Sequence, residues 1–179
     1  MAGEPAPVLE ADIPGYPAAV VVGGSVSLKL FIAGEPVPKD RPRGRVVIPK
    51  GGRPFVQFYE EKKSAEWTEH VAEEAKGQVK KIPVAGQGQD FVLPLQECRV
   101  IITIRYNLTK PKSYPKRIIW PTKKPDSDNL EKAVLDGLVQ GRIIADDALV
   151  TDTYHYKRYA DEQHPAGIEI DLTAIPCEV

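Results

Sequence analysis

The chain has 179 residues, of which 42% are hydrophobic, enough for one domain with a sizeable core and too few for two domains of ordinary size. No apolar run approaches the roughly 18 residues of a membrane span, the N-terminal segment lacks the cationic start of a secretory signal, and two cysteines are too few for a disulfide framework. The net charge of −1 excludes a uniformly basic protein, so affinity for a polyanion would require charges segregated along the chain.

The charges are segregated in this way. Residues 39–124 hold 19 Lys and Arg against 9 Asp and Glu, a balance of +10, whereas residues 125–179 hold 4 against 12, a balance of −8. A basic surface can hold phosphates through counterion release. An acidic cluster would repel phosphates unless metal ions neutralised it. The combination indicates metal-dependent chemistry on a phosphate backbone.

The N-terminal part predicts an arm followed by a strand. Residues 1–24 are rich in Ala, Gly, Pro and Val and contain no cation, which is typical of a flexible arm. That arm can add an edge strand near Ala18–Val22. We expect the folded domain over residues 25–179, beginning with Ser25–Ile32, where partly alternating apolar side chains predict a half-buried strand.

A proline-rich segment and a hairpin come next. The segment reads GEPVPKDRPRGR, and its prolines favour an extended backbone without regular ladders. Arg45–Ile48 and Phe55–Tyr59 flank the turn sequence PKGGRP and predict a hairpin. The extended segment displays the cations Lys39, Arg41, Arg43 and Arg45.

Two helices and further strands complete the pattern. Glu60–Lys81 is helical in pattern, with Ala65, Val71, Ala72 and Ala75 among charged residues. Cys98–Leu108 predicts a central strand with β-branched residues on both faces, and residues 111–125 form a loop. Asp128–Leu138 predicts a helix that ends at Gly141. The closing strands are expected at Ile143–Ala145, Ala148–Arg158 and Gly167–Leu172.

This order of elements predicts a fold class. Strands, a hairpin and two helices alternate without an internal repeat. We therefore expect a single α+β domain with a mixed β-sheet and helices packed on it.

Residues 123–147 carry the densest chemical signal. Asp126 and Asp128 flank the start of a helix, where one such residue commonly serves as the N-cap. Two carboxylates exceed what capping needs. Lys132 lies four residues after Asp128 on the same helix face, where an ion pair is the simpler interpretation. Asp136 extends that row either as a solvated residue or as a side chain that orients Lys132.

Asp146 and Asp147 follow an apolar stretch and could form a solvated turn. Adjacent carboxylates repel one another, and a bound cation relieves the repulsion. Together with Asp126 and Asp128 they offer the oxygen ligands that Mg²⁺ prefers. Zinc is not indicated, because the histidines are scattered singly. These are His70, His155 and His164.

A cationic loop precedes the acidic residues. Between Cys98 and Pro125 the sequence contains eight Lys and Arg and no acid, with Tyr114 and Trp120 interleaved. Such a loop either is simply solvated or grips a phosphate backbone and stacks on an unpaired base. The candidate DNA-binding residues are Lys39, Arg41, Arg43, Lys116, Arg117, Lys123 and Lys124.

These motifs resemble the RusA family of Holliday-junction resolvases, which is common in bacteriophage and prophage genomes. The family pattern is a G-x-P-x-P-K-x-R-P-R-like segment after a strand, then D-x-D-N-x-x-K opening a helix, then a D-D pair. Here the corresponding segments read GEPVPKDRPR from Gly34, DSDNLEK from Asp126 and ADD from Ala145. The resemblance covers about Val26 to Leu172.

The resemblance implies a homodimer that binds four-way DNA junctions and cuts them symmetrically with Mg²⁺ or Mn²⁺. It implies no small-molecule cofactor, no membrane association, and a location in the cytoplasm of a bacterium or a phage-infected cell. By position, the metal-binding aspartates would be Asp126, Asp128 and Asp147. Lys132 would be the lysine needed for cleavage, and Asp146 a second-rank candidate.

One departure concerns junction selectivity. Well-studied members carry aromatic residues just before the first aspartate that help to open the junction, whereas this chain has Lys124 and Pro125 there. Trp120 or Tyr114 would have to take that role. Two other functions stay open: a non-catalytic DNA-junction or replication-associated binding protein, and a nuclease for other branched DNA or for RNA. Metal-dependent turnover would separate a nuclease from a pure binding protein.

Overall fold

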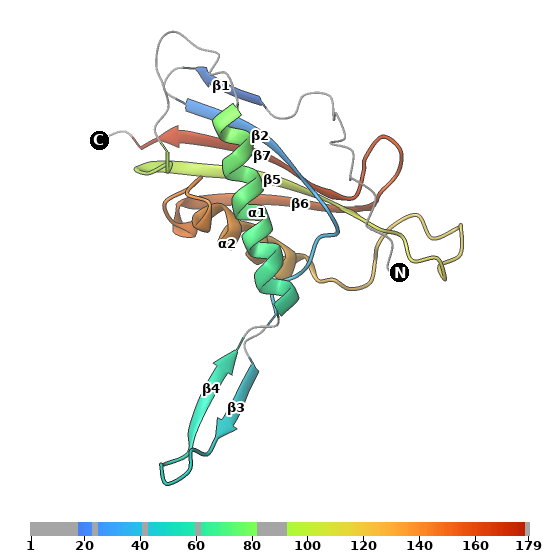
Figure 1. Cartoon of the computed structure of the whole chain (residues 1–179). Helices are drawn as coiled ribbons and strands as arrows, with labels where there is room; N and C mark the ends of the chain where they lie inside the picture. The colour runs from blue at the N-terminus through green and yellow to red at the C-terminus, as the bar shows by residue number, and fades with distance from the viewer. Residues whose placement is uncertain (1–17, 23–24, 41–42, 60–61, 82–92, 178–179) are drawn as a thin grey trace.

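The computed structural model describes residues 18–22, 25–40, 43–59, 62–81 and 93–177. These residues form the α+β arrangement expected from the sequence (Figure 1). The elements are β1 (Ala18–Val22), β2 (Ser25–Ala33), β3 (Arg43–Val47), β4 (Phe55–Tyr59), α1 (Lys62–Lys81), β5 (Cys98–Leu108), α2 (Ser127–Gln140), the 3-10 turn η1 (Asp147–Leu149), β6 (Val150–Tyr159) and β7 (Gly167–Pro176).

Five strands form one mixed sheet in the order β1-β2-β7-β5-β6. All neighbours are antiparallel except β5 and β6, which are parallel and are joined through α2. The expected mixed sheet is therefore confirmed. The edge strand expected at Ala18–Val22 is also present as β1, whereas residues 1–17 of the expected arm lie outside the described residues.

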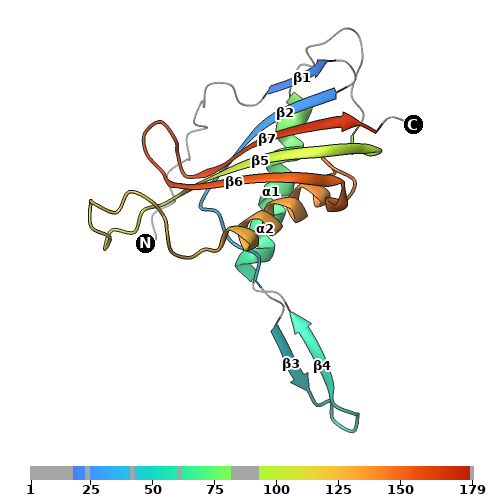
Figure 2. The same ribbon diagram turned by 180° about the vertical axis from the view of Figure 1, so that it is seen from behind.

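Both helices cover one face of this sheet (Figures 1 and 2). On β2 the predicted alternation is confirmed, because Val26, Leu28, Leu30 and Ile32 are buried while Ser27 and Lys29 are exposed. From α2 the stripe Leu130, Val134 and Leu138 is buried in the same core. In α1, Ala65 is exposed, contrary to expectation. The other three residues of the predicted pattern, Val71, Ala72 and Ala75, are buried, and Trp67 and Val79 complete the buried face.

The opposite sheet face carries charged pairs. Arg99 bonds Asp152 at 2.7 Å, which holds the pKa of Asp152 below its ordinary value. Further along, Arg105 pairs with Asp171 and Arg158 with the buried Glu169. The prediction of a central strand at Cys98–Leu108 is confirmed, because β5 lies between β7 and β6 in the sheet. The helices cover one face of β5, and its other face is mostly half-exposed.

The region after α2 differs from the expectation. Ile143–Ala145 is not a strand, since its pairing with the described residues is limited to one isolated bridge between Leu95 and Ile144. Ile143 and Ile144 are nevertheless buried, so their apolar character reflects core packing. Gly141 ends α2 as predicted, but with φ −73°, and Arg142 supplies the positive φ of 57°. Among the described helices, none has the length and apolar character to cross a bilayer.

Candidate active site

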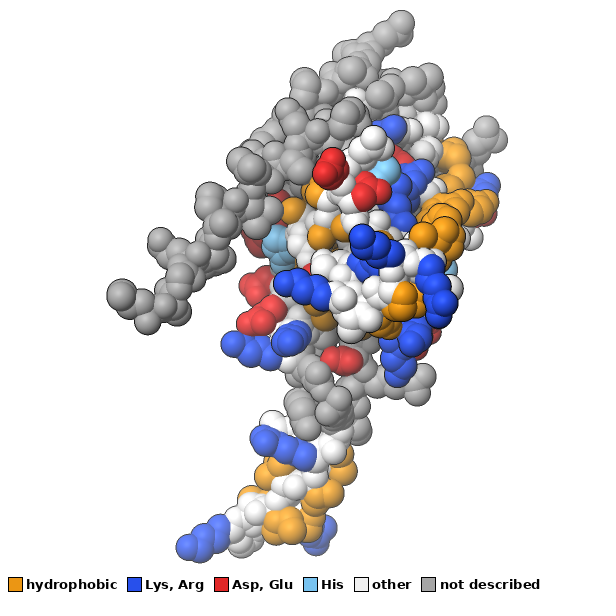
Figure 3. All heavy atoms as spheres, turned by 90° about the vertical axis from the view of Figure 1, so that its right-hand side faces the viewer, with side chains coloured by type: hydrophobic (Ala, Val, Ile, Leu, Met, Phe, Trp, Pro, Cys, Tyr) orange, Lys and Arg blue, Asp and Glu red, His pale blue; other side chains and the backbone are white. Residues whose placement is uncertain are grey.

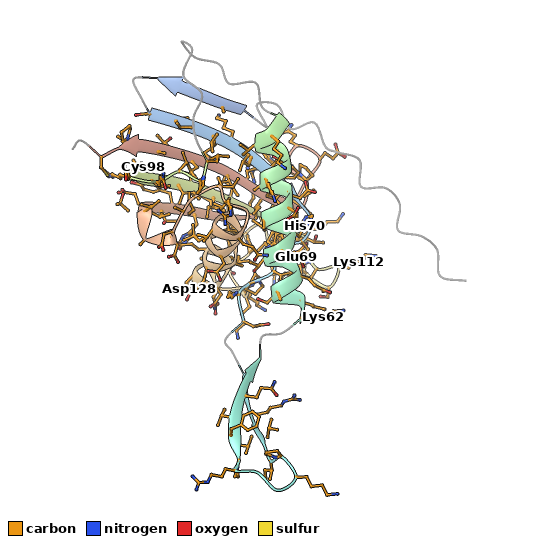
Figure 4. All side chains as sticks on the ribbon, turned by 60° about the vertical axis from the view of Figure 1, so that its left-hand side comes forward. Lys62, Glu69, His70, Cys98, Lys112 and Asp128 are labelled. Atoms are coloured by element: carbon orange, nitrogen blue, oxygen red, sulfur yellow. The ribbon has the colours of Figure 1, made fainter. Side chains whose placement is uncertain are left out.

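The first two candidate aspartates lie at the N-terminus of α2. Asp126 is the N-cap by position, with extended backbone, yet its side chain makes no capping hydrogen bond. Asp128 follows in the first turn, and both side chains are exposed. Capping does not account for either carboxylate, so both remain available to a ligand. In Figure 4, Asp128 lies toward the edge of the body from which the β3–β4 hairpin extends.

Lys132 lies between acids from two elements. Its ammonium is 3.5 Å from Asp136 Oδ1, one turn further along α2, and 3.9 Å from Asp147 Oδ2 in η1. The structure thus brings Asp147 beside α2, as a shared site requires. Asp136 also binds Lys39, whose ammonium lies 2.9 Å from Asp136 Oδ2. The predicted alternative that Asp136 orients Lys132 is consistent with this geometry.

The adjacent Asp146 and Asp147 have different environments. The Asp146 carboxylate accepts a hydrogen bond of 2.8 Å from the Ala148 amide and caps η1. Asp147, the next residue, points its carboxylate toward Lys132. The turn interpretation thus describes Asp146, while Asp147 is the one of the two in contact with the other site residues.

The donor set of the site has the chemistry of a hard-cation site. Its candidate ligands are all carboxylate oxygens, which suit Mg²⁺ or Mn²⁺. Among the residues that the structure describes, however, no three His, Cys, Asp or Glu side chains are grouped closely enough to hold a metal ion. The predicted ligands Asp126, Asp128 and Asp147 are therefore not gathered into a metal-binding cluster among those residues.

The basic loop, residues 111–125, joins the site at its C-terminal end. Lys157 of β6 donates to the carbonyl oxygens of Lys123 at 3.3 Å and Pro125 at 2.9 Å, directly before Asp126. Lys123 also lies over the Tyr114 ring, 5.3 Å from its centroid. Trp120 is 60% exposed. Figure 3 views the side of the body where this loop lies and shows basic and hydrophobic side chains interleaved there.

The predicted DNA-binding residues differ in their surroundings. The loop cations Lys116, Arg117, Lys123 and Lys124 are all exposed. Lys39 is 23% exposed and ion-paired, and its backbone N–H donates to Asn129 of α2. Arg41 lies outside the described residues, as does the side chain of Arg43.

Sequence reasoning missed Lys157 as the residue that holds the loop to the site. The sequence shows only one cation within an alternating strand, and its carbonyl partners lie more than thirty positions earlier. No local spacing could have indicated this contact.

Comparison with known proteins adds independent information. The family model described as endodeoxyribonuclease RusA matches residues 33–173. No curated protein matches the chain. The matched span includes every candidate site residue from Lys39 to Asp147.

Proposed function

This chain belongs to the RusA endodeoxyribonuclease family, and from that premise we propose that it is a Mg²⁺-dependent enzyme that resolves four-way DNA junctions by paired cleavage. Membership makes it an endodeoxyribonuclease; the metal and the residue roles are our proposal. The observation that carries the proposal is the contact of Lys132 with Asp147, because it joins the two acidic motifs across 15 residues of sequence.

We assign the following roles. Asp126, Asp128 and Asp147 would hold the divalent cation, either Mg²⁺ or Mn²⁺. When bound, the cation activates water and neutralises charge on the phosphate. Lys132 stabilises the negative charge that develops on the phosphate, and its contacts with Asp136 and Asp147 hold its ammonium in place. Asp146 shapes the turn that presents Asp147.

The basic loop would bind the substrate beside this site. Lys116, Arg117, Lys123 and Lys124 would contact phosphates. Trp120 is the better candidate for stacking on an unpaired base, because the Tyr114 ring already has Lys123 over it. The contacts of Lys157 with the loop end would keep the stacking residue at a fixed distance from Asp126.

Paired cleavage requires two sites, so we propose a homodimer that acts on DNA in the cytoplasm of a bacterium or a phage-infected cell. One chain contains one set of candidate residues, so two chains are needed to supply two sites. The exposed Tyr154 and Tyr156 lie on β6, the edge strand of the sheet, and supply aromatic surface suited to a subunit contact.

A nicking assay on a synthetic four-way junction tests the assignment. In Mg²⁺ we expect cuts in opposed strands of the junction and none in a linear duplex. Asp128→Asn should lower the single-turnover rate about a hundredfold or more, because it weakens a metal ligand. Glu73→Gln, which removes an exposed carboxylate from α1, is the matched control and should cut like the unaltered protein.

The other outcomes decide between functions. Full activity of Asp128→Asn, or cutting in EDTA, would contradict the proposed site. Cleavage of flaps or three-way forks but not four-way junctions would retain the nuclease and overturn junction resolution. Junction binding without cutting under any divalent cation would identify a non-catalytic binding protein.

A further inference from the structure

The β3–β4 hairpin stands away from the body of the molecule (Figures 1 and 2). Within the part of the chain that the structure describes, its strands pair only with each other, from Arg43 opposite Tyr59 to Val47 opposite Phe55. Opposed residues of an antiparallel pair share a face, and here Val46 is 66% exposed and its partner Val56 53% exposed. A ribbon with solvent on both faces gains little from burial, so its own core does not explain its presence.

The charge of the hairpin indicates what it contacts. Between Arg43 and Tyr59 there are four cations and no acid. Lys50 and Arg53 lie at the exposed tip. Lys50 is within the turn that the Gly52 amide closes by donating to the Pro49 carbonyl oxygen, and Arg53 directly follows that turn. Neither tip cation has an acidic partner among the described residues. Figure 3 shows basic side chains at the end of the hairpin and hydrophobic side chains along it.

A polyanion fits this surface better than a second protein surface does. A protein that packed on the exposed valines would also need acidic side chains to neutralise the four cations of the hairpin. Duplex DNA carries a negative phosphate at every nucleotide. The major groove admits a two-stranded β-ribbon, and apolar side chains can contact thymine methyl groups there. From Arg43 to Gly51 the ribbon reaches about 25 Å, at roughly 3.3 Å per residue.

The base of the hairpin is fixed beside the candidate site. The Lys39 amide donates to the Asn129 carbonyl at 2.8 Å, in the first turn of α2. The Asp40 amide donates to Ser64 Oγ at 3.2 Å, in the first turn of α1. A duplex arm bound along the hairpin would therefore have one end next to Asp128.

We propose that the β3–β4 hairpin is a DNA-binding arm that lies in a groove of one duplex arm of the branched substrate, with Lys50 and Arg53 contacting phosphates. The inference rests on the proposed nuclease function and extends it. The arm adds affinity along the duplex outside the point of cleavage, and it contributes no group to the reaction.

The test removes the two tip cations. Binding of the full-length Lys50→Ala/Arg53→Ala protein to a synthetic four-way junction is measured in Ca²⁺ across a salt series, with arms of about 15 or about 5 base pairs. Losing two phosphate contacts should make the negative slope of log K against log salt shallower by about 2. Affinity for the long-armed junction should fall about tenfold or more, while affinity for the short-armed junction stays close to that of the unaltered protein.

Lys76→Ala/Lys80→Ala is the matched control, because it removes two exposed cations from the other end of α1. It should keep the original slope and affinity. An unchanged salt slope in the tip variant would overturn the proposal that the hairpin is a DNA-binding arm. So would a tip variant that loses its dimeric state by sedimentation and binds more weakly at both arm lengths, since the hairpin would then be a subunit contact.

The arm and the proposed nuclease can fail separately. If the unaltered protein cuts junctions in Mg²⁺ and the tip variant binds with the original slope, only the arm is wrong. If the unaltered protein binds but never cuts, while the tip variant shows the shallower slope, the arm stands and the nuclease is wrong.

Discussion

At the scale of single residues, the position of Lys132 depends on a shared carboxylate. Asp136 contacts two ammonium groups, Lys132 at 3.5 Å and Lys39 at 2.9 Å. The Lys39–Asp136 pair is the more enclosed, with side chains 23% and 27% exposed, whereas Lys132 is 59% exposed. Lys39 therefore neutralises an acid that would otherwise hold Lys132 more tightly and away from a phosphate.

Lys39→Met separates this positioning role from the phosphate contact that the sequence predicts. We expect the single-turnover cleavage rate to fall about tenfold, equivalent to roughly 1.4 kcal/mol. The salt slope of junction binding should stay the same. A salt slope made shallower by about 1, with an unchanged cleavage rate, would show instead that Lys39 contacts a phosphate. Lys39→Arg should restore the rate, because it keeps the ion pair.

Much of the candidate site could be predicted from local spacing. Asp128 and Lys132 share a helix face because they are four residues apart. Spacing could not distinguish Asp146 from Asp147, because the difference arises from the 3-10 turn that directs one carboxylate to an amide and the other to Lys132. The pairing of Lys39 with Asp136 was equally hidden, since 97 residues separate the two.

At the scale of elements, the two helices cross closely at glycines of α2 and its end. A Cβ on Gly141 would lie 2.6 Å from the Ala72 carbonyl oxygen of α1. A Cβ on Gly137 would lie 2.6 Å from a Val71 methyl group. Gly141 is thus required by close packing with backbone, since its φ of −73° suits any residue. This contact holds the helix that carries Asp128 against α1.

Gly141→Ala should therefore destabilise the protein by about 1–3 kcal/mol through overpacking. Gly77→Ala is the matched control in α1, where an added Cβ meets nothing within 4 Å. That substitution should stabilise the protein by about 0.5–1 kcal/mol through helix propensity. Urea unfolding measures both. Equal effects of the two substitutions would contradict the close crossing.

The elements themselves were predicted well where periodicity was long. The alternation in β2 and the stripe of α2 each repeat several times, so they determine both type and face. Ile143–Ala145 was misjudged because a short apolar run is compatible with a strand or with a buried turn. The buried face of α1 was shifted because Trp67 and Val79, rather than Ala65, supply its large core contacts.

At the scale of the whole molecule, the net charge of +10 counted over residues 39–124 overstates the positive charge that is available to DNA. Arg99 and Arg105 lie in the basic segment, yet they pair with Asp152 and Asp171 on the open sheet face. The exposed cations lie in the 111–125 loop, on the hairpin and along α1, where Glu residues accompany them. Sequence counts predict segregation, but only the sheet register shows which charges cancel across strands.

The proposed paired cleavage predicts a homodimer in solution. Sedimentation velocity at micromolar concentration should give twice the chain mass of 19.7 kDa. Tyr154→Ser/Tyr156→Ser should weaken the dimer if the edge strand β6 forms the contact. A monomer at all concentrations that still makes paired cuts would contradict the requirement for two associated sites.

The hairpin's attachment bears on how this protein could change over evolution. Its base is held by the backbone amides of Lys39 and Asp40, and only Ser64 contributes a side chain to these two bonds. Most substitutions in the hairpin would leave such bonds intact. The hairpin could therefore vary in length and sequence while the aspartates stay in place, so that substrate range could diversify without loss of catalysis.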